Sequence, residues 1–176
     1  SSFNLKKIIK LAVIPTTAGS GAEVTSNAVM YINKLKYSFE GEELVPNNFF
    51  LLPELILKNN KKLKASSGID AIAQALESMI SLKSNSKSLL YASNSLKINL
   101  KNYINYLKKP NKHNSSSMLF GAMLAGKAIN ISKTTAPHAI SYPFTSIYKI
   151  SHGHAVSLTL EKFLKFNFLN NNKSIS

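Results

Sequence analysis

The feature that most constrains the fold is a change of hydrophobic period between residues 57 and 66. Before it, short apolar runs such as Lys10–Pro15 stop in polar or Gly-rich stretches, which is typical of buried strands. After it, apolar residues recur three and four positions apart, as at Ile69, Ile72 and Leu76, which is typical of an amphipathic helix. Strands followed by helices, rather than alternating with them, indicate two domains.

The period assigns most of the chain to strands or helices, with a β part at 1–60 and a helical part at 61–176. Expected strands are Lys10–Pro15, Val24–Tyr31, Lys36–Phe39 and Leu51–Leu57, with a turn at Asn33–Lys34 and a linker at Lys58–Lys64. Expected helical stretches are 66–80, 86–107, 115–128, 137–148 and 154–168, with Ser67 and Ser115–Ser117 as caps. The β part has too few strands to cover both faces of a sheet, so we expect a fragment that is incomplete at both ends.

Composition excludes several classes of site and partner. Cysteine is absent, so a metal would need His, carboxylate or amide ligands. The net charge of +14 would suit nucleic acid, but the basic residues are all Lys and are scattered along the chain. Arg supplies the bidentate contacts to guanine and phosphate, so no nucleic-acid partner is expected. No apolar run reaches the roughly 18 residues of a membrane helix, so we expect no membrane partner and a cytoplasmic location.

A loop rich in Gly and hydroxyl side chains, Thr16–Thr25, follows the first predicted strand. Its backbone N–H and side-chain O–H groups could bind phosphate or ribose oxygens. The alternative is an ordinary turn between strands, and composition alone favours that turn. The loop matches neither the Walker pattern nor GxGxxG.

Acidic and amide side chains share one face of the first predicted helix. Asp70 and Gln74 stand four positions apart, and Glu77 follows one turn later. Asp70 could be a metal ligand, or it could complete a capping box with Ser67. The residues themselves do not decide between these two interpretations.

Three of the chain's 4 histidines, His138, His152 and His154, lie close together in the sequence, while His113 sits in a polar stretch. His138 and His152 are flanked by small or apolar residues, where an unpaired imidazole is costly to bury. A core histidine bonded to backbone is the commoner explanation of any one of them. Two such histidines after an acidic helix favour a divalent metal more than either does alone.

These motifs together resemble the iron-containing (group III) alcohol dehydrogenase family. Ile14–Thr25 is similar to its nucleotide loop, and Gly68–Ser78 is similar to its metal-binding helix. His138, followed fourteen positions later by His152, looks like its two-histidine element. The resemblance runs from about Leu11 to Asn167 and leans toward the phosphonoacetaldehyde reductase branch. It implies the end of a Rossmann-like α/β nucleotide-binding domain, followed by part of an all-helical metal-binding domain.

The resemblance also implies roles for individual residues. The implied metal ligands, for Fe²⁺ or Zn²⁺, are Asp70, Gln74, His138 and His152. The implied contacts to NAD or NADP are Thr16, Thr17, Gly19, Ser20 and Lys36. The metal would act as a Lewis acid on the oxygen of a small alcohol or aldehyde, with hydride passing to or from the nicotinamide. His154 or Tyr142 would start the proton relay.

One departure from the family concerns the fourth ligand. Many relatives have histidine where this chain has Gln74, and an amide is a weaker, neutral ligand. We expect the isolated chain to be inactive, because the family's Gly-rich diphosphate loop is missing, and we expect a homodimer at full length. Two alternatives stay open: a lyase of the same architecture, such as dehydroquinate synthase, and an inactive fragment that keeps the helical core.

Overall fold

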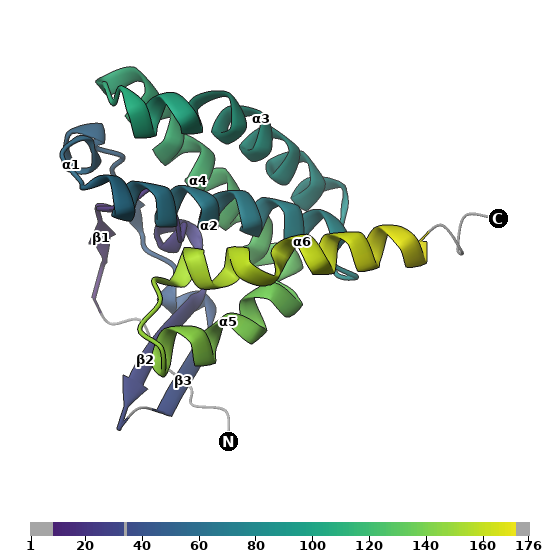
Figure 1. Ribbon diagram of the computed structural model, residues 1–176. Coiled ribbons are helices and arrows are strands. Elements are labelled where there is room, and N and C mark those ends of the chain that lie inside the picture. The colour runs from purple at the N-terminus through teal and green to yellow at the C-terminus, as the bar shows by residue number, and fades with distance from the viewer. Residues whose placement is uncertain (1–8, 34, 172–176) are drawn as a thin grey trace.

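A bundle of three helices forms the body of the molecule, with a helix pair and a small β region placed against it (Figure 1). The computed structural model describes residues 9–33 and 35–171; for Tyr31, Leu35, Lys36 and Asn171 it describes the backbone alone. The bundle consists of α2 (Lys61–Ile80), α3 (Ser86–Lys108) and α4 (Lys112–Ser132), and the pair is α5 (Ala136–Ser146) and α6 (His152–Asn171). No helix among the described residues is long and apolar enough to cross a membrane.

The β region consists of two separate strand pairs. The short strands β1 (Ala12–Val13) and β4 (Asn48–Phe49) pair in parallel. The strands β2 (Asn27–Ile32) and β3 (Leu35–Glu40) form an antiparallel hairpin. Short 3₁₀ turns, η1 (Ala22–Val24) and η2 (Glu42–Leu44), flank the hairpin. The first three predicted strands are therefore confirmed in place, although Val24 belongs to η1 and Lys34 of the predicted turn lies outside the described residues.

The fourth predicted strand is wrong, because Pro53–Leu57 forms the short helix α1. Pro53 is at the start of this helix, where proline's missing N–H costs no hydrogen bond and its fixed φ suits the helix. Ile56 is fully buried, which explains the apolar run without a strand. An apolar run of this length does not distinguish a strand from one buried helical turn.

The predicted linker at Lys58–Lys64 is also wrong from Lys61 onward, where α2 begins. Asn60 caps this helix, its side chain accepting the Leu63 N–H at 2.8 Å. Ser67 is therefore well inside the helix and does not cap it. The capping-box interpretation of Asp70 fails for the same reason.

The core lies where α2, α3 and α4 meet, and it is built mainly from small side chains. Asn85 and Asn111 cap α3 and α4 with capping boxes, so the predicted cap at Ser115–Ser117 is wrong. Gly121 of α4 touches Asn99 of α3, which allows the two helices to approach closely. Fully buried alanines of this core include Ala71, Ala75, Ala92, Ala125 and Ala128.

The helix pair α5–α6 packs on the side of α2 away from α3 (Figure 1). Val156 and Leu160 of α6 bury their side chains against Ala73 of α2. Gly153 lies against the Ser66 carbonyl, where a larger side chain would overlap the backbone. This packing turns the first residue of α6 toward the middle of α2, where Asp70 lies.

Candidate metal centre

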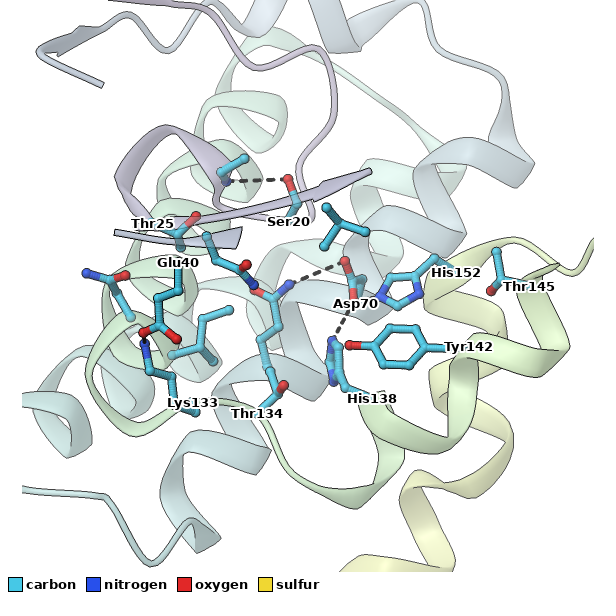
Figure 2. A pocket seen from close by; sticks show the side chains of 16 residues that line it. Ser20, Thr25, Glu40, Asp70, Lys133, Thr134, His138, Tyr142, Thr145 and His152 are labelled. Carbon is cyan, nitrogen blue, oxygen red and sulfur yellow. Dashed lines mark hydrogen bonds and ion pairs between the residues drawn. The ribbon is translucent and has the colours of Figure 1, made fainter. Parts of the chain in front are cut away.

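A cavity of about 570 Å³ opens between the helices and the β2–β3 hairpin. Figure 2 shows Asp70, His138, His152 and Tyr142 gathered at one end, with Lys133, Glu40 and Thr25 at the other. The first group comes from α2, α5 and α6, and the second from the hairpin region and the end of α4. The N-terminal hairpin thus faces the helical part of the chain across the cavity.

Three residues from three helices meet at the helical end of the cavity. One ligand atom each of Asp70, His138 and His152 lies within 4.8 Å of the others. The Asp70 Oδ1 atom is 3.2 Å from His138 Nε2 and 3.9 Å from His152 Nε2. Asp70 and His138 are buried, whereas the side chain of His152 is 41% exposed. One carboxylate and two imidazoles at these distances can bind one divalent cation.

His138 is held from both sides by carboxylates. Its Nδ1 lies 2.5 Å from Glu77 Oε1, opposite the Nε2 that faces Asp70. Burial by itself lowers the pKa of His138, but the hydrogen bonds to Asp70 and Glu77 outweigh burial and raise the pKa to about 10. Both imidazole nitrogens therefore face a carboxylate, and a bound metal would take the place of a proton on Nε2.

Gln74 borders the same end of the cavity, one turn after Asp70. Its Nε2 donates to Asp70 Oδ2 at 3.3 Å. Its Oε1 is buried without a hydrogen-bond partner. Because buried polar atoms normally have a partner, this oxygen would be satisfied by a cation or a water, and the amide is therefore compatible with a metal site.

The two residues expected to start a proton relay lie in different places. Tyr142 lines the cavity, and its ring stacks on His152 with centroids 6.3 Å apart. His154 is exposed and lines a separate hollow of about 260 Å³, with Tyr103 and Ser151. The structure therefore brings Tyr142, and not His154, to the candidate metal ligands.

Of the loop residues expected to contact the cofactor, Ser20 lines the cavity, as do Ala22 and Thr25 after it. Thr16, Thr17 and Gly19 are not among its lining residues. The Thr16 carbonyl accepts a hydrogen bond from Asn59, and Gly19 packs on Ser67 of α2. Lys36 is in β3, but its side chain falls outside the part of the chain that the structure describes.

Several residues of the site were not expected from the sequence. Glu77 could have been identified from the sequence, because its spacing from Asp70 and Gln74 places it on the same helix face. Asn27 and Val29 alternate along β2 and so face the cavity together. No motif or spacing in the sequence pointed to Lys133, which lies at the end of α4.

Models of two families match the chain. The C-terminal part of the Fe-containing alcohol dehydrogenase family matches residues 64–176. The iron-containing alcohol dehydrogenase family matches residues 1–53. The two matches meet between residues 53 and 64, near the change of hydrophobic period.

Curated relatives and solved structures are similar along most of the chain. Phosphonoacetaldehyde reductase of Streptomyces viridochromogenes is 29% identical over 90% of the chain and 41% of its own length. The 4-hydroxybutyrate dehydrogenase of Clostridium kluyveri is 28% identical over 92% of the chain and 45% of its own length. The structure of sulfoacetaldehyde reductase from Bifidobacterium kashiwanohense in complex with NAD⁺ superposes with a TM-score of 0.87 and is 32% identical in sequence. The match covers 90% of this chain and 43% of the reductase.

These matches confirm the predicted fold class, an α/β segment followed by an all-helical domain. The chain spans less than half the length of each of the three proteins.

Proposed function

Because the chain belongs to the iron-containing alcohol dehydrogenase family, we propose that it carries the metal-binding part of an NAD(P)-linked oxidoreductase. The reaction is the interconversion of a primary alcohol and an aldehyde by hydride transfer. The observation that carries this proposal is the meeting of Asp70, His138 and His152 on one side of a cavity large enough for a small substrate.

The chain's own residues divide the work at this site. Asp70, His138 and His152 would hold a divalent cation, Fe²⁺ or Zn²⁺, and Gln74, whose buried Oε1 has no hydrogen-bond partner, would be the fourth protein ligand. The bound cation would supply Lewis acidity at the substrate oxygen, and a nicotinamide would supply or accept the hydride. Tyr142, stacked on His152 within the cavity, would relay the alcohol proton by accepting it while its own hydroxyl proton passes to solvent, whereas His154 is on another surface.

The opposite wall of the cavity is proposed as the cofactor and substrate side. A related structure holds NAD⁺, which supports NAD or NADP as the cofactor here. Ser20 is the proposed contact that borders the cavity, while Thr16, Thr17, Gly19 and Lys36 remain expectations from the family resemblance.

An aldehyde with an anionic group is the proposed substrate class. Phosphonoacetaldehyde, sulfoacetaldehyde and 4-hydroxybutyrate, in the names of the relatives, each have an acidic group beyond the reacting carbon. Lys133 borders the far end of the cavity and pairs with Glu40, so the anionic group of a substrate would bind Lys133 by replacing Glu40 as its partner. In the full-length protein, Lys133→Met should raise KM for phosphonoacetaldehyde about tenfold and leave KM for a neutral aldehyde unchanged, as expected for one lost charge contact of about 1.4 kcal/mol.

Metal content tests the proposal most directly. The chain should bind one equivalent of Zn²⁺ after dialysis, and Asp70→Ala or His152→Ala should remove it, as measured by elemental analysis. His113→Ala is the matched control, because His113 is exposed in the first turn of α4. Unchanged metal content in both ligand variants would refute the metal centre.

Turnover separates the remaining alternatives. Oxidation of NADH or NADPH with small aldehydes by the full-length protein supports the oxidoreductase, whereas lyase chemistry without net redox change supports the dehydroquinate-synthase-like alternative. We expect no turnover from the 176-residue chain alone. A homodimer at full length and a cytoplasmic location are part of the proposal and are tested by light scattering and cell fractionation.

A further inference from the structure

We propose that Glu77 is a positioning residue that holds His138 with its Nε2 atom turned to the cavity. The inference rests on the proposed metal centre, in which His138 is a ligand. Glu77 is on α2, two helical turns after Asp70, and does not itself border the cavity. Among the described residues, its hydrogen bond to a candidate metal ligand is the one to His138.

Both oxygens of the Glu77 carboxylate are committed to α5 and the residue before it. Oε1 lies 2.5 Å from His138 Nδ1. Oε2 accepts the Thr135 backbone N–H at 2.5 Å and the Thr135 hydroxyl at 2.8 Å. Glu77 is 0% exposed, so water does not compete for these bonds. Three donors around a buried carboxylate leave it one orientation.

The geometry determines which imidazole nitrogen can bind metal. A neutral imidazole carries one N–H and one lone pair, and the hydrogen bond made by one nitrogen decides the role of the other. Nδ1–H donating to Glu77 leaves the lone pair on Nε2, the nitrogen that faces Asp70 at 3.2 Å. A carboxylate behind the ring also makes the imidazole a stronger ligand.

A purely structural role is the competing explanation, because Glu77 also ties α2 to the start of α5. Two substitutions separate the roles. Glu77→Gln keeps the side-chain shape but removes the charge and one acceptor. Thr135→Val removes one of the bonds that tie the helices and leaves the contact between Glu77 and His138 in place.

Metal affinity distinguishes these explanations without using activity. Zn²⁺ titration of the chain by calorimetry should show about 10- to 100-fold weaker binding for Glu77→Gln, the usual cost of losing such a partner. Thr135→Val should bind within about threefold of wild type, because its imidazole contact is unchanged. With Co²⁺ bound in place of Zn²⁺, the visible absorption bands of Glu77→Gln should differ from those of the wild type, whereas the bands of Thr135→Val should not.

Equal affinity for Zn²⁺ in wild type and Glu77→Gln, with His152→Ala still losing it, would overturn the positioning role and leave the metal centre standing. Absence of Zn²⁺ binding by the wild type would overturn both. If Glu77→Gln does not fold, ¹⁵N NMR of the Zn²⁺-loaded wild type decides. Nδ1–H with metal on Nε2 of His138 supports the proposal, and the reverse assignment overturns it.

Discussion

The two walls of the cavity are built in different ways. The helical wall, with Asp70, His138 and Gln74, comes from buried helix faces joined by hydrogen bonds. The N-terminal wall presents Asn27 and Val29 of the hairpin, both exposed. The helical wall can therefore hold ligand geometry by itself, whereas the N-terminal wall depends on a few attachments to the helices.

Those attachments can be named. Gly21, at φ 62°, packs on Gly126 of α4, where a side chain on either glycine would meet backbone. Asn130 Oδ1 accepts both the N–H and the hydroxyl of Ser26, at 2.8 and 2.9 Å. Lys133 pairs with Glu40 at the end of β3. Substitutions at these points should affect one wall and spare the other.

The largest effect is expected on the helical wall, from Gly153→Ala. A Cβ at this position would overlap the Ser66 carbonyl and crowd Asp70, so α6 must move away from α2. We expect a loss of about 2–3 kcal/mol in the free energy of unfolding, measured with urea, together with weaker Zn²⁺ binding. Gly41→Ala is the control, because a Cβ there would meet only the end of the Glu43 side chain, and it should cost less than about 0.5 kcal/mol.

The next effect is expected on the N-terminal wall, from Asn130→Ala. This change leaves the buried Ser26 N–H and hydroxyl without their acceptor, which should cost about 1–2 kcal/mol. Amide hydrogen exchange in β2 should accelerate, while Zn²⁺ affinity stays at the wild-type value. A fall in Zn²⁺ affinity would show that the two walls are coupled, and would contradict the view that the helical wall holds the ligand geometry by itself.

A smaller effect is expected from the exposed ion pair between Lys133 and Glu40. Their side chains are 37% and 59% exposed, so solvent screens the attraction. Glu40→Gln should cost less than about 1 kcal/mol, and the cost should shrink in high salt. A cost that is insensitive to salt would mean that packing, rather than charge, joins the hairpin to α4.

The smallest effect is expected at Glu23 in η1, where burial raises the pKa of the carboxyl. Below its unfolded pKa of 4.5 the group is neutral in both states, so burial carries no charge penalty. Stability should therefore fall as pH rises through the raised pKa, and Glu23→Gln should remove that fall. Thermal unfolding between pH 4 and 8 measures it. A wild-type melting temperature that rises over this range, with the rise lost in Glu23→Gln, would contradict the assigned direction.

Much of the helical region was predictable because its signals are local. The period of apolar residues placed α3 within one residue of its ends and gave the order of the helices. The predicted caps were wrong: Ser67 and Ser115–Ser117 were expected to cap α2 and α4, but Asn60 and Asn111 do so. The run at Leu51–Leu57 failed because its length does not separate a strand from a helical turn.

By itself the sequence determined the metal-ligand types, since a chain without cysteine has only His, carboxylate and amide groups to offer. It also determined that Asp70, Gln74 and Glu77 share a helix face, because the helical repeat requires it. Only the tertiary structure decided which side chains meet. The fold of α5 and α6 against α2 brings His138 and His152 to Asp70, turns His154 to another surface and places Glu77 behind His138. These distances depend on how helices far apart in the sequence pack together, and the spacing of residues along the chain does not determine that packing.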